Sequence, residues 1–316
     1  MNISIVIPVR NGGATLRRCL ASLKKQTIQP LEIVILDTAS IDNSREIAKE
    51  FGAKIIDIQA EDFDHGLTRN EGVRHCSGDL IYMTVQDAWI PDPEMFEKMA
   101  AHFDDPEVMA VCGHQAVPHE KDKNPVRWYR RYSDHTEEVR QVHDVESFKK
   151  LPQASQQKLV AWDNVVAMYR KEALIALPFV QTAMSEDWVW SYQALCRGWK
   201  LLRDSSLVVY HYHHQTPGYV FRTNWSVNYH FYKFFGYRPE LPALMMPALR
   251  SVYHLAKNRN LSLKEKAYWA IHNVLWRMSE CRAALSFRWK LRFSGKAGLY
   301  AAYRKYCHAI PQGKLK

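Results

Sequence analysis

Residues 3–13, ISIVIPVRNGG, decide the architecture of this 316-residue chain. Their first seven side chains are mostly β-branched and apolar, which is typical of a buried strand. The turn residues Asn11, Gly12 and Gly13 follow, and apolar side chains then recur at helical spacing from Leu16 to Leu23. We therefore expect a strand, a tight turn and a helix at the start of the chain.

The same alternation of strand and helix continues through residue 85. Apolar runs predict strands at residues 31–36, 53–58 and 79–85. Helices are expected between them, one capped by residues 42–44 and one at residues 68–76. This alternation indicates an α/β fold with a parallel sheet and helices on both faces.

The rest of the chain is less regular. Strands are expected at residues 162–169 and 207–212, and Ser185 is expected to cap a helix that runs to about residue 197. Residues 118–157 are polar, charged and weakly periodic, so we interpret them as a long insertion or a partly mobile loop. From residue 238 onward the sequence favours helices.

The net charge of +10 is unevenly distributed. Residues 241–316 hold 15 Lys and Arg against two Glu, which gives this tail +13 and leaves −3 on residues 1–240. A nucleic-acid-binding protein would be expected to carry its positive charge on the working domain, so this class is disfavoured. The six cysteines form no CxxC pair, which favours reduced structural thiols over a zinc site. No apolar run reaches the roughly 18 to 20 residues that cross a bilayer, and no signal peptide is evident, so we expect a cytoplasmic protein.

Three acidic stretches suggest a shared cleft. They contain Asp37 in DTASID, Asp87 in TVQDA and Asp187 in SEDWVW. A lone Asp after a strand is most often a turn or cap residue, and first-turn acids are favoured by the helix dipole alone. Ligands of open α/β sheets, however, bind at the carboxyl ends of strands, where Asn11, Asp37 and Asp87 are predicted to lie.

These side chains suit a nucleoside diphosphate. Asp37 can accept hydrogen bonds from a pyrimidine imide and from sugar hydroxyls. A divalent cation held by Asp87 and His211 would neutralise the phosphates, although packed or solvent-facing histidines are the alternative for the HYHH stretch. Asp187, beside Trp188 and Trp190, can remove a proton from an acceptor hydroxyl.

The ordered motifs SIVIPVRNGG, EIVILDTASIDNS, TRNEGVRHCSGDLIYMTVQDA and SEDWVW resemble the inverting family 2 glycosyltransferases with a GT-A fold. FDHGLTRN, together with QDA at residues 86–88, is similar to bacterial rhamnosyltransferases of that family. The resemblance covers about residues 2–215. It implies a Rossmann-like, mostly parallel sheet flanked by helices in a catalytic domain at residues 1–237. The nucleotide-sugar half would span about 1–117 and the acceptor half about 118–237, followed by a basic helical extension at 238–316.

The resemblance also implies roles for single residues. Asp187 matches the catalytic base, with Glu186 and Trp188 at the acceptor. Asp87 matches the last acid of the DxD motif, and His211 matches a histidine that joins the metal in some members, which implies Mg²⁺ or Mn²⁺ as cofactor. The nucleotide-sugar pocket would be lined by Pro8, Val9, Arg10, Asn11, Asp37, Arg69, Asn70 and Gln86.

Two positions depart from the family pattern. Val85 stands where the first acid of DxD is usual, so one metal-binding carboxylate is missing. Thr38 replaces the second acid that is common after the second strand, which affects the expected ribose contacts. Neither departure removes the expected base.

The expected function is an inverting transfer of L-rhamnose from dTDP-L-rhamnose to a hydroxyl of a bacterial surface polysaccharide, such as lipopolysaccharide, or of a lipid-linked glycan. The alternatives are a UDP-hexose or UDP-galactofuranose transferase and a non-catalytic glycan- or lipid-carrier-binding protein. The presence of Asp87 and Asp187 disfavours the latter, and no Gly-rich loop of a nucleotidyltransferase follows the first strand.

The basic tail carries a separate expectation. Arg288, Lys290 and Arg292 alternate with aromatic side chains, which favours peripheral binding to anionic lipids on the cytoplasmic face of the inner membrane. The alternative is a solvated basic helical cap on the catalytic domain. The sequence is compatible with a monomer or an oligomer.

Overall fold

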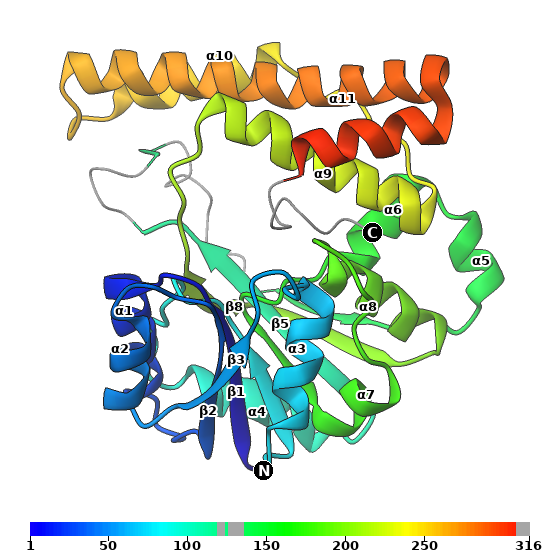
Figure 1. The fold of residues 1–316 in the computed structure, drawn as a ribbon. Helices are drawn as coiled ribbons and strands as arrows, with labels where there is room; N and C mark the ends of the chain where they lie inside the picture. The colour runs from blue at the N-terminus through cyan, green and yellow to red at the C-terminus, as the bar shows by residue number, and fades with distance from the viewer. Residues whose placement is uncertain (119–123, 126–135, 308–316) are drawn as a thin grey trace. The chain divides into compact units, whose positions relative to one another are not determined.

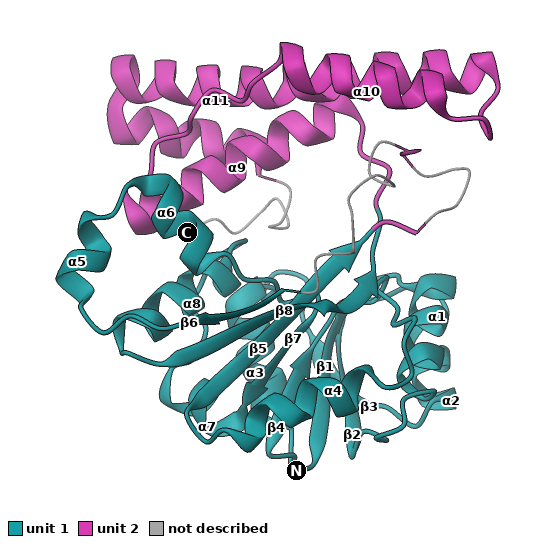
Figure 2. Ribbon diagram, turned by 180° about the vertical axis from the view of Figure 1, so that it is seen from behind, with its two compact units in different colours: residues 1–116, 132–212 teal, residues 117–131, 213–316 magenta. Residues whose placement is uncertain are grey.

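The computed structural model describes residues 1–118, 124–125 and 136–307. The chain divides into two compact units (Figure 2). Unit 1 comprises residues 1–116 and 132–212, and unit 2 comprises residues 117–131 and 213–316. None of the helices in the described ranges combines the length and apolarity needed to cross a membrane.

Unit 1 is built on an eight-stranded sheet with the order β3-β2-β1-β4-β7-β5-β8-β6 (Figure 1). The strand pairs among β1 to β4 are parallel, and so is the pair of β5 and β8. Strand β7 lies between β4 and β5 and is antiparallel to both. Strand β6 is an edge strand that pairs with β8 in antiparallel orientation. The mostly parallel sheet expected from the sequence is confirmed. The strands are β1 (Ile3–Val9), β2 (Glu32–Thr38), β3 (Lys54–Ile58), β4 (Leu80–Met83), β5 (Val108–Ala116), β6 (Glu137–Arg140), β7 (Ala167–Arg170) and β8 (Lys200–Tyr210).

Helices cover both faces of this sheet because both faces are apolar. Successive side chains of a strand point to opposite faces, so Ile5 and Ile7 of β1 join the core under α1, α2 and α4, whereas Val6 joins the core under α3, α7 and α8. The helices of unit 1 are α1 (Gly13–Leu23), α2 (Ser44–Glu50), α3 (His65–Arg74), α4 (Met95–Ala101), the 3₁₀ turn η1 (His102–Asp104), α5 (Val145–Lys150), α6 (Gln153–Val160), α7 (Lys171–Ala176) and α8 (Glu186–Cys196).

The structure of unit 1 differs from the sequence-based expectation in several places. The segment expected to be an insertion contains β6, α5 and α6, and Asp144 caps α5 by accepting hydrogen bonds from two backbone N–H groups. Residues 119–123 and 126–135 of that segment lie outside the described residues. Strand structure begins only at Ala167, not at residue 162. Ser185 precedes α8, but its side chain makes no capping hydrogen bond, and its backbone is left-handed with φ of 65°.

In its described residues, unit 2 contains the helices α9 (Pro217–Phe235), α10 (Met245–Lys257) and α11 (Leu263–Tyr306). The sequence predicted helices only from residue 238, so α9 was missed. Its aromatic side chains pack on α11, with Tyr229 stacked on Tyr303 at 4.2 Å between ring centroids. At Gly295 the backbone leaves helical geometry (φ 58°, ψ −160°), and the last part of α11 turns back (Figure 1).

Candidate active site

The loops after β1 and β2 are joined to each other by side-chain hydrogen bonds. The backbone N–H of Asn11 donates to Ser40 Oγ at 2.9 Å, and the N–H of Ile41 donates to Asn11 Oδ1 at 2.9 Å. Within the described residues, the non-glycine positions with positive φ are Asn11, Ala39 and Ser185, and each lies in a loop expected to face ligand. Strained backbone of this kind persists where surrounding contacts hold it, and it concentrates at functional sites.

The loop after β4 is joined to the same edge of the sheet. Gln86 Oε1 accepts the backbone N–H of Arg10 at 2.8 Å, and its Nε2 donates to the Arg10 carbonyl at 3.2 Å. Arg10 is exposed, Pro8 is partly buried, and the Val9 side chain lies in the core. Gln86 thereby connects the loops that carry Asp87 and Arg10.

Asp37 is the buried carboxylate of this edge, with 2% of its side chain exposed. Its Oδ2 accepts a hydrogen bond from Arg45 Nη1 at 2.9 Å, and Arg45 also pairs with Asp57. Asp37 Oδ1 and the hydroxyl of Thr38 are buried and have no hydrogen-bond partner within the described part of the chain. Because unpaired buried oxygens are costly, both atoms are suited to receive donors from a ligand.

The FDHGLTRN motif attaches α3 to the loop that precedes α8. Asp64 Oδ1 accepts the backbone N–H groups of Gly66, Leu67 and Thr182, and Asn70 exchanges two hydrogen bonds with the backbone of Phe179 at 2.8 and 2.9 Å. A Cβ on Gly66 would lie 1.9 Å from the carbonyl oxygen of Val180, so only glycine fits this contact.

Arg69 and Glu186 form a buried ion pair between α3 and α8. Arg69 Nη1 lies 3.0 Å from Glu186 Oε1, and 4% and 6% of the two side chains are exposed. Asn164 Nδ2 also donates to Glu186 Oε1 at 3.0 Å. Burial opposes ionisation of Glu186, but Arg69, His65 and the hydrogen bond from Asn164 together outweigh it and lower the pKa of that carboxyl. The contacts of Arg69 and Glu186 suit a supporting role beside Asp187, and their predicted roles at donor and acceptor stay predictions.

Asp187 lies in the first turn of α8. Its carboxylate accepts the backbone N–H of Asn164 at 3.2 Å and that of Trp188 at 2.8 Å. Burial, and then the negative charges of Glu186 and Asp163, raise the pKa of Asp187 well above its usual value. A carboxylate with a raised pKa holds a proton more firmly, which suits a general base. Trp188 is partly buried and packs against the core.

Asp87 and His211 come together from the ends of β4 and β8. His211 Nε2 lies 3.4 Å from Asp87 Oδ1, and 15% and 18% of the two side chains are exposed. Both belong to a group of acidic and histidine side chains whose ligand atoms are close enough to share one metal ion. Ligands on neighbouring corners of an octahedral ion with bonds of about 2.1 Å lie about 3 Å apart, so the pair fits a Mg²⁺-like ion after a small adjustment.

Gln115 of β5 fixes which nitrogen of His211 carries the proton. Gln115 Nε2 donates to the carboxylate of Asp163, so the amide oxygen turns toward His211 Nδ1 at 2.8 Å. An amide oxygen only accepts, and therefore Nδ1 must be the protonated nitrogen. In a neutral ring with the proton on Nδ1, the lone pair is on Nε2, the nitrogen that faces Asp87, and this is the tautomer that a metal ligand needs.

Sequence reasoning did not find Arg45, Gln115, Asp163 or Asn164. Gln115 is placed by the pairing of β5 with β8, whose register shifts between Cys112 and His114. Gly113 permits this shift, because a Cβ there would lie 2.3 Å from the Leu207 carbonyl oxygen. The local signals were Gly113 within the apolar stretch of residues 108–113, which was not predicted as a strand, and the WDN triplet after α6.

Comparison with known proteins gives two kinds of match. A family model described as "Glycosyl transferase family 2" matches residues 4–176. The O-antigen chain rhamnosyltransferase RfbN of Salmonella typhimurium is 31% identical over 224 residues, which cover 69% of this chain and 68% of that protein. WbaN of Salmonella anatum, also named an O-antigen chain rhamnosyltransferase, is 29% identical over 70% of this chain and 69% of that protein.

Solved structures share the fold at low sequence identity. TarS of S. aureus (residues 1–349) matches with a TM-score of 0.54 and 14% identity, covering 98% of this chain and 81% of that one. The mannosyltransferase PcManGT of Pyrobaculum calidifontis, solved with GDP-Man and Mn²⁺, matches with a TM-score of 0.55 and 16% identity, covering 96% and 86%. These likenesses show the GT-A fold that the sequence motifs implied.

Proposed function

The chain belongs to glycosyl transferase family 2 and is a glycosyltransferase, and we propose that it transfers L-rhamnose from dTDP-L-rhamnose with inversion. The proposed acceptor is a hydroxyl of a bacterial surface polysaccharide or of a lipid-linked glycan. The observation that carries the reaction type is Asp187, a partly buried carboxylate with a raised pKa in the first turn of α8. The sugar and acceptor rest on the similarity to the two O-antigen rhamnosyltransferases.

In the proposed reaction Asp187 takes the proton of the acceptor hydroxyl. The acceptor oxygen forms its bond to the anomeric carbon from the face opposite the nucleotide, while the bond from that carbon to the diphosphate oxygen breaks. The bonding electrons leave with the diphosphate, so the configuration inverts. The two backbone N–H groups that Asp187 accepts, from Asn164 and Trp188, hold the carboxylate in place for this step.

The nucleotide is proposed to bind at the ends of β1 and β2. Asp37 Oδ1 would accept the imide N–H of a thymine or uracil base, and the Thr38 hydroxyl would meet the ribose. Arg45 is proposed to hold Asp37 in this orientation through Oδ2, which leaves Oδ1 available. Arg10 is exposed at the same edge and supplies a positive charge for the phosphates.

Asp87 and His211 are proposed to hold a divalent cation, Mg²⁺ or Mn²⁺. Such a cation supplies positive charge that stabilises the leaving diphosphate. With valine at position 85 the site has one carboxylate fewer than the usual motif, and the imidazole of His211 is proposed to take that ligand position.

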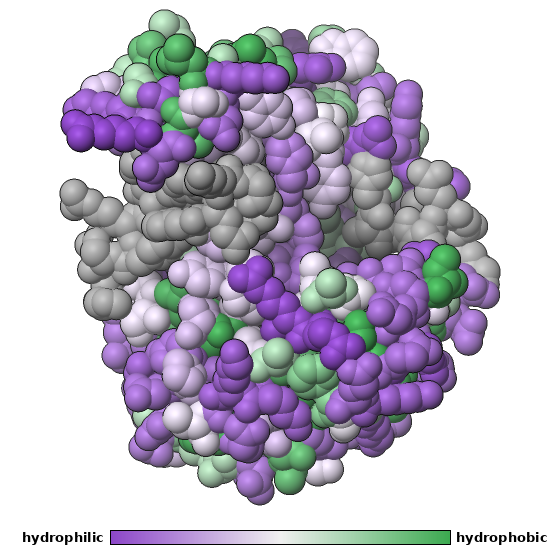
Figure 3. Space-filling model, turned by 90° about the vertical axis from the view of Figure 1, so that its left-hand side faces the viewer, coloured by the Kyte–Doolittle hydropathy of each residue, from purple (hydrophilic) through white to green (hydrophobic). Residues whose placement is uncertain are grey.

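The helical unit is proposed to contact an anionic membrane surface on the cytoplasmic side. Trp289 and Phe293 are 57% and 63% exposed, and cations lie over both rings, Lys290 over Trp289 and Arg292 over Phe293. Such mixed aromatic and cationic side chains suit an interface. The face drawn in Figure 3, which is the left-hand side of Figure 1, shows hydrophobic patches broken up by hydrophilic side chains.

A panel of nucleotide sugars tests the donor. Each is added to the purified enzyme with Mg²⁺, and the melting temperature and the product linkage on a lipid-linked acceptor are measured. We expect dTDP-L-rhamnose to stabilise the enzyme most and to be turned over. Preferred binding and turnover of a UDP-hexose or UDP-galactofuranose would overturn the rhamnose proposal, and binding without any transfer would favour a non-catalytic binding protein.

A further inference from the structure

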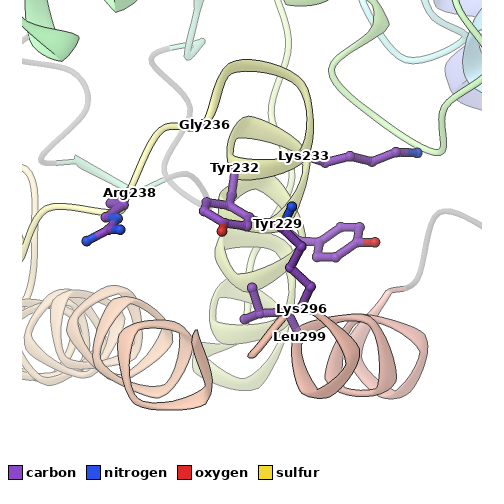
Figure 4. Close-up of a pocket in the computed structure, with 7 residues that line it drawn as sticks. All are labelled: Tyr229, Tyr232, Lys233, Gly236, Arg238, Lys296 and Leu299. Atoms are coloured by element: carbon purple, nitrogen blue, oxygen red, sulfur yellow. The ribbon is translucent and has the colours of Figure 1, made fainter. Parts of the chain in front are cut away.

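Unit 2 contains a pocket of its own, with a volume of about 520 Å³, between the end of α9 and the turn in α11 (Figure 4). Three cations line it, Lys233, Arg238 and Lys296, together with the phenol rings of Tyr229 and Tyr232. In the close-up Lys296 reaches toward the space between the two tyrosines, Arg238 lies on one side of it, and Lys233 lies on the other with its side chain extending away from the tyrosines. All of these residues belong to unit 2.

Two glycines with positive φ shape the pocket. Gly236, with φ of 72°, ends α9 and lets the chain turn toward Arg238. Gly295 interrupts the helical geometry of α11, so that the segment after it, which carries Lys296 and Leu299, runs in a different direction. The buried Leu299 anchors this segment, and Tyr229 is held by stacking on Tyr303. The walls of the pocket are therefore fixed by packing.

Few acids are present in unit 2 to neutralise the two lysines of the pocket. Residues 213–307 contain three carboxylates, Glu240, Glu265 and Glu280, and the last two are engaged elsewhere. Glu265 completes the capping box of α11, and Glu280 pairs with Arg277 at 2.7 Å. In the part of unit 2 that the structure describes, no carboxylate forms an ion pair with Lys233 or Lys296. Cations gathered in a concave site raise the local concentration of anions.

We propose that this pocket binds a phosphate or diphosphate group carried by a lipid. Ammonium groups and phenol hydroxyls together offer several donors, which matches an anion with several oxygens better than a single carboxylate. The exposed rings of Trp289 and Phe293 precede the turn in the same helix, so apolar surface for a lipid lies next to the pocket in sequence. The volume is within the range of ordinary ligand sites. The lipid part of the proposal rests on the proposed membrane contact, whereas the anion site does not.

The test uses the full chain, inorganic pyrophosphate and vesicles of phosphatidylcholine with or without phosphatidylglycerol. The pocket variant is Lys233→Gln with Lys296→Gln. The matched control is Arg259→Gln with Lys264→Gln, which removes two exposed charges of unit 2 outside the pocket. We expect pyrophosphate to raise the melting temperature of the wild type and control, and the pocket variant to need at least about tenfold more pyrophosphate.

The vesicle arm identifies the source of the phosphate. Loss of binding to anionic vesicles in the pocket variant alone, and displacement of the wild type by pyrophosphate, would support a lipid-borne group. Loss of the pyrophosphate effect with unchanged vesicle binding would overturn the lipid source. Equal weakening in the pocket and control variants would overturn the site altogether, because the effect would then be general charge.

Stabilisation by dTDP, measured on the same variants, keeps this proposal separate from the donor chemistry. It reports on unit 1 and should not change in either variant. A wild type that fails to bind dTDP would count against the proposed donor and leave the pocket result standing.

Discussion

The buried pair of Arg69 and Glu186 gives a prediction with two independent readouts. Glu186→Gln removes one of the negative charges that raise the pKa of Asp187, so that pKa should fall. Transfer requires Asp187 in its deprotonated form. The rate of the wild type should rise with pH through the raised pKa of Asp187, and in the variant this rise should move to lower pH.

The stability readout follows from burial. Only 4% of the Arg69 side chain and 6% of that of Glu186 are exposed, so removing one partner leaves the other buried and unpaired. Breaking a pair of this kind costs about 3–5 kcal/mol. At roughly 2–4 °C per kcal/mol for a domain of this size, Arg69→Met should lower the melting temperature by roughly 6–20 °C.

The assays are a pH series of kcat/KM with saturating metal, and thermal unfolding of the same variants. The control for stability is Arg69→Met with Glu186→Leu, which removes both charges and should regain most of the lost stability. In Glu186→Gln, the rise of kcat/KM with pH should shift to lower pH. A rise that stays at the wild-type pH, or moves to higher pH, would refute the electrostatic link to Asp187. A melting temperature of Arg69→Met within about 1 °C of the wild type would refute the buried pair.

Three further outcomes follow from the same geometry. A chelator should abolish transfer, and added Mn²⁺ or Mg²⁺ should restore it. Asp87→Asn should weaken Mn²⁺ binding, measured by electron paramagnetic resonance. Transfer that persists in the presence of the chelator would contradict a metal role. Gln115→Met should weaken Mn²⁺ binding about 10- to 100-fold. In the metal-free wild type, ¹⁵N NMR should show His211 protonated on Nδ1. Protonation on Nε2 instead would contradict the assigned tautomer. Gly113→Ala should destabilise the protein by about 1–3 kcal/mol through contact with the Leu207 carbonyl. Gly218→Ala should leave the stability unchanged, because a Cβ at that position would meet nothing within 4 Å. Equal melting temperatures of the two variants would count against the close approach at Gly113.

The first four strands and the positions of the acids at their ends were predictable because they depend on local periodicity. The apolar runs before Asp37 and Asp87 specify buried parallel strands, and parallel strands bring their carboxyl ends to one edge. The sequence-based expectation that Asp87 and His211 belong to one site agrees with their 3.4 Å separation, although their role as ligands stays a proposal.

The parts that were missed depend on contacts between distant residues. Arg69 and Glu186 are 117 positions apart, and Gln115 and His211 are 96 positions apart, so no local pattern indicates either pair. Both pairs are created by packing: α3 against the loop before α8, and β5 against β8. Helix α9 was missed because its aromatic side chains cover more than one face, which obscures the helical period.

The central claim is that Asp187 is the base of an inverting sugar transfer, and Asp187→Asn tests it most directly. The substitution keeps the size of the side chain but removes its ability to accept a proton at neutral pH. Turnover of dTDP-L-rhamnose should fall by about 10²- to 10⁴-fold, while stabilisation by the donor stays at the wild-type level. Turnover close to that of the wild type, with donor binding intact, would contradict the claim.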